Sequence, residues 1–279
     1  MLKGLSRAGL GDIGSDERFI ALAAVYGFEA VDCDALGLVE RNGTDGAAAL
    51  LSENNMKIGS IGLPVEWRST EGEFRKGLPL LTAAAEAAAL LGCTACCTYV
   101  LPSTDLKAAH FMALATKRLR ICAQILGAFG IRLGLEFVGP YHLRTRWSNP
   151  FIWTMDETLD WINAIGEPNV GLLLDSYHWY TNGPDIRAIE KLQPSQIVHV
   201  HINDAPDIKV EDVLDNDRLY PGEGVIDLPG FLRVLASIGY KGVVAQEILT
   251  PSAPADPPET LLNRSKEGFD KVFGLAGLS

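Results

Sequence analysis

Four strand-like runs in this sequence each end on a residue that can bind a metal ion, and this feature limits the fold most strongly. The clearest run is Val198–Asp204, whose β-branched residues are typical of a buried strand although it carries two histidines. The four runs end at Glu136, Asp175, His201 and Glu247. Because the carboxyl ends of neighbouring parallel strands meet at one edge, we expect these side chains to form one metal site at the top of a barrel.

The rest of the chain alternates strands with helices about eight times, which favours a parallel sheet closed into a (β/α)8 barrel. We expect one α/β domain over residues 1–279, closed by a C-terminal helix at Pro258–Phe273. An open doubly wound sheet is the alternative, but it does not explain why four successive strands carry similar chemistry. Earlier helices are predicted at Ser15–Tyr26, Thr44–Asn54, Glu73–Leu91, Asp105–Phe129, Thr154–Ile165, Asp185–Leu192 and Leu228–Ile238.

Composition limits the partners of the chain. A net charge of −11 argues against nucleic-acid binding, which needs a basic face. The sequence has neither the apolar run of a membrane span nor that of a signal peptide, so we expect no membrane partner and a cytoplasmic location. Five cysteines, an odd number in a long chain, argue against a disulfide framework. The sequence leaves open whether the chain forms a homo-oligomer such as a dimer or tetramer.

Three carboxylates and one imidazole suit Mn²⁺, Mg²⁺, Co²⁺ or Zn²⁺, and these ligands do not choose among them. Any one of the acids could instead cap a helix or form an ion pair at a strand–helix junction. That alternative weakens when all four residues stand at equivalent positions on successive strands. The sequence therefore predicts one divalent ion held by Glu136, Asp175, His201 and Glu247.

Five further residues are candidates for substrate binding because they lie on loops that should face the same cavity. His178 follows Asp175 by three residues, and His142 lies in the loop after Glu136. Arg218, in the loop after the His201 strand, could clamp a substrate oxygen. Trp67 and Arg68 could form the far wall. The alternative for each is a surface or structural role.

The other histidines and the cysteines are weaker candidates for a functional site. His199 has the same strand parity as His201 and is either a hydrogen-bond partner behind the metal ligands or a core histidine. His110, on a helix, is interpreted as structural. Cys93, Cys96 and Cys97 resemble a metal motif but have no second cysteine pair, so packing is the favoured interpretation.

From Gly134 onward the sequence resembles the xylose isomerase-like TIM-barrel superfamily of sugar isomerases and epimerases. The segments that carry the resemblance are GLEF, NVGLLLDSYH, VHVHINDA, DRLYPGEGVIDL and GYKGVVAQEI. It is most similar to 2-keto-myo-inositol (inosose) isomerases of inositol catabolism and, at the same places, to ketohexose 3-epimerases. The loop between His201 and Arg218 is longer than in the epimerases, which argues against their substrates.

The resemblance implies that Glu136, Asp175, His201 and Glu247 bind one metal ion. Manganese is the metal that it favours most. It implies that Glu136 and Glu247 move protons on either face of the substrate, and that His178 and Arg218 contact substrate oxygens. The implied function is a metal-dependent isomerase or epimerase of a polyol ketone or sugar, acting through a metal-stabilised enediolate.

Three other functions stay open at this point, because the scaffold does not determine the reaction. A lyase or dehydratase would form the same enolate and expel an oxygen, with His142 or His178 as the acid. An abasic-site endonuclease would need additional histidines on the first strands, but the first histidine of this sequence is His110. A non-catalytic sugar binder would have no need for two glutamates.

Overall fold

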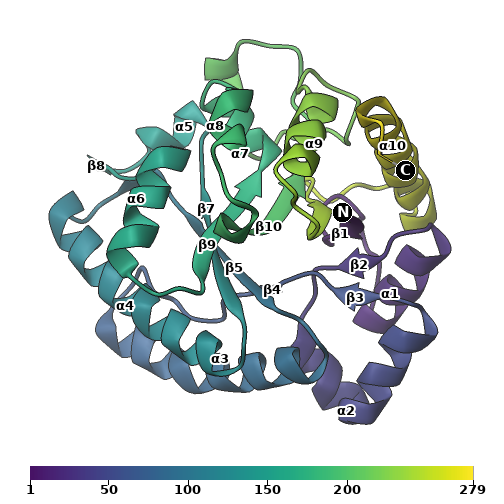
Figure 1. The fold of residues 1–279 in the computed structure, drawn as a ribbon, viewed down its shortest axis with the longest axis horizontal. Coiled ribbons are helices and arrows are strands. Elements are labelled where there is room, and N and C mark those ends of the chain that lie inside the picture. The colour runs from purple at the N-terminus through teal and green to yellow at the C-terminus, as the bar shows by residue number, and fades with distance from the viewer. Residues whose placement is uncertain (279) are drawn as a thin grey trace.

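The computed structural model describes residues 1–278 and shows a ring of parallel strands surrounded by helices (Figure 1). Hydrogen bonding orders the strands β3-β2-β1-β11-β10-β9-β7-β5-β4, and every pairing in this sheet is parallel. The strands are β1 (Leu2–Leu5), β2 (Ala30–Val31), β3 (Lys57–Ile58), β4 (Ile61–Gly62), β5 (Ala95–Val100), β7 (Arg132–Phe137), β9 (Val170–Asp175), β10 (Ile197–Ile202) and β11 (Val243–Gln246).

The barrel closes at β3 and β4, two short strands that together occupy one strand position. β3 pairs with β2, whereas β4 pairs with β5, and only Gly59 and Ser60 separate β3 from β4. Counted as one position, β3 and β4 give the eight strands of a barrel. The prediction of a (β/α)8 TIM barrel is thus confirmed, and the open doubly wound sheet is excluded.

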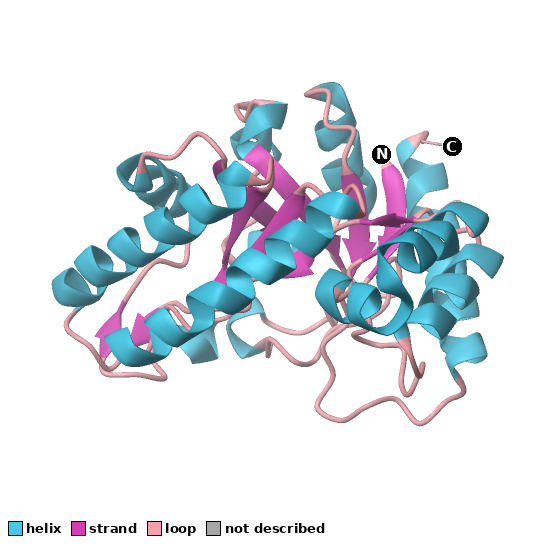
Figure 2. Ribbon diagram, turned by 90° about the horizontal axis from the view of Figure 1, so that it is seen from below, coloured by secondary structure: helices cyan, strands magenta, loops and turns pink. Residues whose placement is uncertain are grey.

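Long helices cover the outside of the barrel, which Figure 2 shows from below. They are α1 (Asp16–Val25), α2 (Ala35–Glu53), α3 (Glu71–Leu90), α4 (Ala108–Ala128), α6 (Met155–Ile165), α9 (Leu228–Ser237) and α10 (Pro258–Ala276). The last helix, α10, packs against α1 and α9, and Lys3 of β1 forms an ion pair with its Asp270. The two ends of the described chain therefore meet beside one another, as expected for a closing helix.

Short elements lie in the segments that connect the strands. They are α5 (Tyr141–Arg144), α7 (Ser176–Thr181), α8 (Ile186–Glu190), the 3₁₀ turns η1 (Pro194–Gln196) and η2 (Val210–Asp212), and a small antiparallel pair, β6 (Ser103–Thr104) with β8 (Asn149–Pro150). The sequence predicted loops at α5 and α7. Their helical turns place His142 and His178 on ordered structure instead.

Helix starts follow the capping chemistry of the sequence. The Ser15 side chain accepts a hydrogen bond from the Arg18 backbone N–H, and Thr154 forms the predicted capping box with Glu157. The helix α2 consists of two segments that meet at Gly43, where φ is +69°, a backbone conformation that glycine adopts without strain. The predicted helix from Thr44 matches the second segment, and the first segment, which begins at Ala35, was not predicted.

Most of the buried core is apolar, and its cysteines form no disulfide. All five cysteines are free, and burial raises the pKa of the Cys93 thiol to about 11. Within residues 1–278, the groups of side chains arranged to hold a metal contain no cysteine. The packing interpretation of the cysteines is therefore consistent with the structure.

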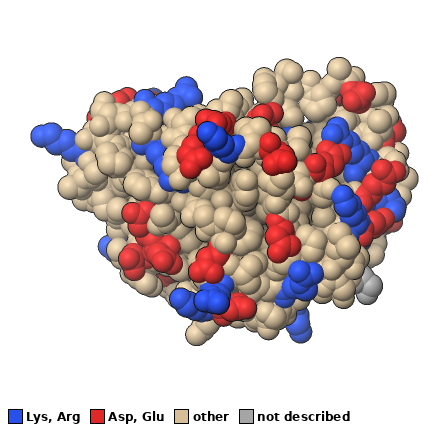
Figure 3. Space-filling model, turned by 90° about the horizontal axis from the view of Figure 1, so that it is seen from above, with Lys and Arg blue, Asp and Glu red and all other residues tan. Residues whose placement is uncertain are grey.

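On the face shown in Figure 3, acidic and basic side chains are interspersed rather than gathered into a basic patch. None of the helices in the described chain combines the length and the apolar character needed to cross a membrane.

Candidate metal centre

Four side chains meet at the carboxyl ends of four adjacent strands. Glu136, Asp175 and His201 lie on β7, β9 and β10, and Glu247 directly follows β11. One ligand atom from each of the four lies within 4.8 Å of the others. His201 Nδ1 is 3.5 Å from Glu247 Oε2, 3.7 Å from Glu136 Oε1 and 4.0 Å from Asp175 Oδ2. The structure thus brings together all four residues that the sequence selected.

The chemistry of this cluster fits a divalent cation. Glu136 Oε1 and His201 Nδ1 are buried and have no hydrogen-bond partner among the described residues, and both face the cluster. Buried polar atoms normally have partners, so a cation would satisfy both atoms. Carboxylate oxygens with one imidazole nitrogen suit Mn²⁺, Mg²⁺, Co²⁺ or Zn²⁺.

Arg218 balances part of the negative charge. Its Nη1 donates to Asp175 Oδ2 at 2.9 Å and to Glu247 Oε2 at 3.0 Å, and its side chain is 1% exposed. The loop that carries it is tied to the strand end, because Asp204 and Leu219 exchange backbone hydrogen bonds. Arg218 is therefore built into the cluster rather than held above it.

The electrostatic field separates the two glutamates. Burial raises the pKa of Glu136, and the nearby negative charge of Glu247 raises it further. Burial acts in the same sense on Glu247, but the positive charges of His201 and Arg218 outweigh it and hold the pKa of Glu247 below its usual range. Two carboxyls with opposed pKa shifts in one cluster are suited to different roles in proton transfer.

Asp175 is fixed in place by neighbours on three sides. Its Oδ1 accepts a hydrogen bond from the backbone N–H of Tyr177 at 2.6 Å, and the Asn203 side-chain amide donates to both oxygens. With Arg218 as the third partner, this fully buried side chain has one orientation toward the cluster. A rigid ligand of this kind pre-forms the site.

Asp32 is a neighbour of the cluster that the sequence reasoning missed. It directly follows β2, and its Oδ2 lies 2.9 Å from His199 Nε2 and 3.1 Å from His201 Nε2. Burial opposes the charge on Asp32, but the two histidines outweigh it and lower its pKa. The signal was present, because Asp32 ends a strand in the same way as the four chosen residues.

His178 also points toward the cluster. Its Nε2 lies 3.9 Å from Glu136 Oε1 and 3.4 Å from Arg218 Nη2, and the ring is 1% exposed. The Gly139 backbone N–H donates to its Nδ1 at 3.3 Å, and Arg218 Nη2, which can only donate, lies next to its Nε2. His178 thus places Nε2 between Arg218 and Glu136.

The remaining three candidates lie apart from this cluster. Trp67 is fully buried, donates to Thr98 Oγ1 and stacks on Phe111, so it is a core residue rather than the expected wall of the site. Arg68 packs its guanidinium over the rings of Trp67 and Tyr99, and does not line the cavity at the cluster. His142 lies in α5, which packs against η2, and does not line the cavity at the cluster.

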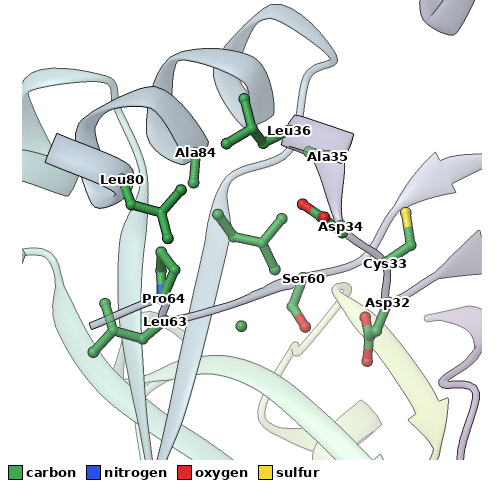
Figure 4. Close-up of a pocket in the computed structure, with 12 residues that line it drawn as sticks. Asp32, Cys33, Asp34, Ala35, Leu36, Ser60, Leu63, Pro64, Leu80 and Ala84 are labelled. Atoms are coloured by element: carbon green, nitrogen blue, oxygen red, sulfur yellow. The ribbon is translucent and has the colours of Figure 1, made fainter. Parts of the chain in front are cut away.

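A cavity of about 200 Å³ opens onto the ligands. It is lined by Ser6, Asp32, Ser60, Ile61, Gly62, Cys97, Thr98, Tyr99, Glu136, Leu173, His201 and Glu247. A second cavity of about 460 Å³ shares Asp32, Ser60, Ile61 and Gly62 with it. Figure 4 shows its apolar wall of Leu36, Leu80 and Ala84, with Asp32 and Ser60 at the opposite end. The ligand cluster is thus open to a small molecule.

Residues 20–271 match the family model described as xylose isomerase-like TIM barrel, and the chain belongs to this family. A xylose isomerase domain protein from Alicyclobacillus acidocaldarius has a solved structure that is 35% identical in sequence. The two structures superpose with a TM-score of 0.91, over 99% of each chain.

Two curated relatives carry names that describe an activity. An inosose isomerase of Bacillus velezensis is 31% identical over 150 residues, which are 54% of this chain and 51% of that protein. A 3-dehydroshikimate dehydratase of Pseudomonas aeruginosa is 31% identical over 148 residues, which are 52% of this chain and 22% of that protein. The matched segments thus span about half of the first relative and 22% of the second, and both relatives are named as enzymes.

Proposed function

We propose that the chain is a divalent-metal-dependent isomerase or epimerase of a polyol ketone, with an inosose or a keto-sugar as substrate and manganese as the first choice of metal. The observation that carries the proposal is that Glu136 and Glu247 both line one small cavity beside a cluster suited to a cation. The similarity to an inosose isomerase supports the same class of substrate. Binding a sugar alone does not require two carboxylates beside a metal.

A divalent ion held by Glu136, Asp175, His201 and Glu247 would polarise a substrate carbonyl as a Lewis acid. The two glutamates approach the cavity from β7 and from the end of β11, with β9 and β10 between them. Glu247 and Glu136 would accept and return the proton of a carbon next to the carbonyl, one on each side of the substrate.

Arg218 and His178 lie beside the two glutamates, outside the lining of the cavity. Arg218 carries a permanent charge 3.0 Å from Glu247, and His178 Nε2 lies 3.9 Å from Glu136. We propose that both contact hydroxyl oxygens of a polyol bound at the ligand cluster. The buried setting strengthens these contacts.

A lyase or dehydratase is the second candidate. The observation in its favour is the similarity to a 3-dehydroshikimate dehydratase. Loss of a neighbouring hydroxyl needs an acid on the leaving oxygen, and His178 is the side chain placed to supply it. Mass spectrometry separates the two functions, because an isomerase product keeps the mass of its substrate and a dehydratase product loses water.

The test is exchange of the substrate's carbon-bound hydrogen with solvent deuterium, followed by NMR on a panel of inososes and ketohexoses. Wild type with Mn²⁺ should incorporate deuterium next to the carbonyl. Glu247→Gln keeps an oxygen for the metal but cannot accept the proton, so its exchange rate should fall by about 10²–10⁴-fold. Glu223→Gln is the matched control, because Glu223 forms a surface ion pair with Arg264.

Two results would count against the proposal. Exchange by Glu247→Gln at the wild-type rate would remove Glu247 as the base. Absence of exchange by the wild type with every ketone of the panel, at full metal loading, would remove the isomerase function itself.

A further inference from the structure

We propose that Asp32 is a positioning residue, which fixes the orientation of His201 so that Nδ1 alone is offered to the metal. The inference rests on the proposed metal centre, but not on the identity of the substrate. Asp32 Oδ2 lies 2.9 Å from His199 Nε2 and 3.1 Å from His201 Nε2. One carboxylate oxygen therefore contacts both histidines of β10.

The chemistry of these contacts determines which ring nitrogen carries a proton. An ionised carboxylate can only accept hydrogen bonds, so both Nε2 atoms must carry a proton. His201 Nδ1 is then the nitrogen whose lone pair can bind a cation, and it is the atom that faces Glu136, Asp175 and Glu247. Metal-binding histidines are commonly oriented by a carboxylate on their other nitrogen.

Asp32 contacts these rings from a strand that is not adjacent to theirs in the sheet. Asp32 follows β2, whereas both histidines lie on β10, and β1 and β11 stand between those strands in the sheet. The carboxylate therefore crosses the interior of the barrel. A side chain added at Gly59 would place its Cβ 2.6 Å from Asp32 Oδ1 and 3.3 Å from His199 Cε1. The bend between β3 and β4 thus needs glycine for space.

His199 gives the carboxylate a second anchor. The ring of His199 is 1% exposed and meets the ring of His201 edge to face, with centroids 5.1 Å apart. A carboxylate held by one ring could rotate with it, whereas two perpendicular rings fix its position. His199 therefore acts through Asp32, and His199 is not expected to touch the substrate.

The first measurement is NMR of zinc-loaded wild type, in which Zn²⁺ serves as a diamagnetic probe. Long-range ¹⁵N–¹H spectra should show His201 bound to zinc through Nδ1, with a proton on Nε2 that exchanges slowly with water. A spectrum with zinc on Nε2 and the proton on Nδ1 would overturn the inference without any variant.

The second measurement is zinc affinity by competition with a chelator. Asp32→Asn has the same shape but can donate to Nε2 through its amide, which favours the wrong tautomer of His201. We expect its zinc affinity to fall by about 10–100-fold, the usual effect of losing such a partner. Asp34→Asn, which removes an exposed acid two residues away, should bind zinc as wild type does. Thermal melting of the metal-free variants checks that each is folded.

The outcomes separate this inference from the proposed function. Zinc binding by Asp32→Asn within about twofold of wild type, with His201 still protonated on Nε2, would overturn the positioning role and leave the metal centre intact. Failure of the wild type to bind zinc would overturn the metal centre and the positioning role together.

Discussion

Two buried regions of the barrel are filled by side chains of opposite character, ionisable in one and aromatic in the other. The ligand cluster (Glu136, Asp175, His201 and Glu247) places four ionisable side chains within 4.8 Å of one another. The aromatic cluster (Trp67, Phe111, Phe151 and Trp161) fills its space with rings whose centroids lie 4.8–6.0 Å apart along each contact. The ligand cluster keeps charged groups in a buried region, whereas the aromatic cluster excludes both charge and water.

The difference teaches that burial alone does not indicate what a residue contributes. Buried aromatic rings gain free energy from the apolar surface that they remove from water. Buried like charges cost free energy unless a counter-charge is supplied. We therefore expect substitutions in the aromatic cluster to lower stability and substitutions in the ligand cluster to alter function, with stability unchanged or raised.

The largest effect is expected at Trp67. Replacing Trp67 by alanine removes a fully buried indole and its hydrogen bond to Thr98, so the free energy of unfolding should fall by about 3–5 kcal/mol. Urea denaturation measures this loss. Zinc affinity of the folded fraction should stay at the wild-type value, because Trp67 does not line the cavity at the ligands.

Trp147→Ala is the matched control, because Trp147 is only partly buried. It should cost clearly less stability than Trp67→Ala. An equal loss for both tryptophans would break the distinction between the aromatic cluster and ordinary surface packing.

A smaller effect of opposite sign is expected at Glu136. Folding raises the pKa of this carboxyl, so at neutral pH its ionised form opposes folding in the metal-free protein. Glu136→Gln removes the charge at constant shape, and the metal-free variant should be more stable by about 1 kcal/mol in denaturation with a chelator present. The exposed Glu86→Gln should change stability by less than about 0.5 kcal/mol. A clear loss of stability in Glu136→Gln would show that this acid is a structural ion-pair partner.

The sequence predicted the ligand cluster because strand ends in a barrel are equivalent positions. Glu136, Asp175, His201 and Glu247 each stand at the end of a mainly apolar run, so their register could be inferred without coordinates. Asp32 follows the same rule, but β2 has only two residues and gave a weak pattern. Its partners lie 167 and 169 residues away, a distance that local patterns do not bridge.

The loops were predicted less well because tertiary contacts determine them. Trp67 looked like a wall residue from its place after a strand, but the rings of α4 and α6 draw it into the core. Arg218 was expected above the site, and the charges of Asp175 and Glu247 hold it inside instead. Short helices at α5 and α7 could not be distinguished from loops by periodicity over a few residues.

The central claim is that the strand ends hold one divalent ion, and metal content tests it most directly. Wild type, stripped with a chelator and dialysed against Mn²⁺ or Zn²⁺, should retain about one ion per chain by elemental analysis. His201→Ala should retain far less while melting as a folded protein, because the aromatic cluster is untouched. Equal metal content in His201→Ala and wild type, or a folded wild type that retains none, would contradict the account.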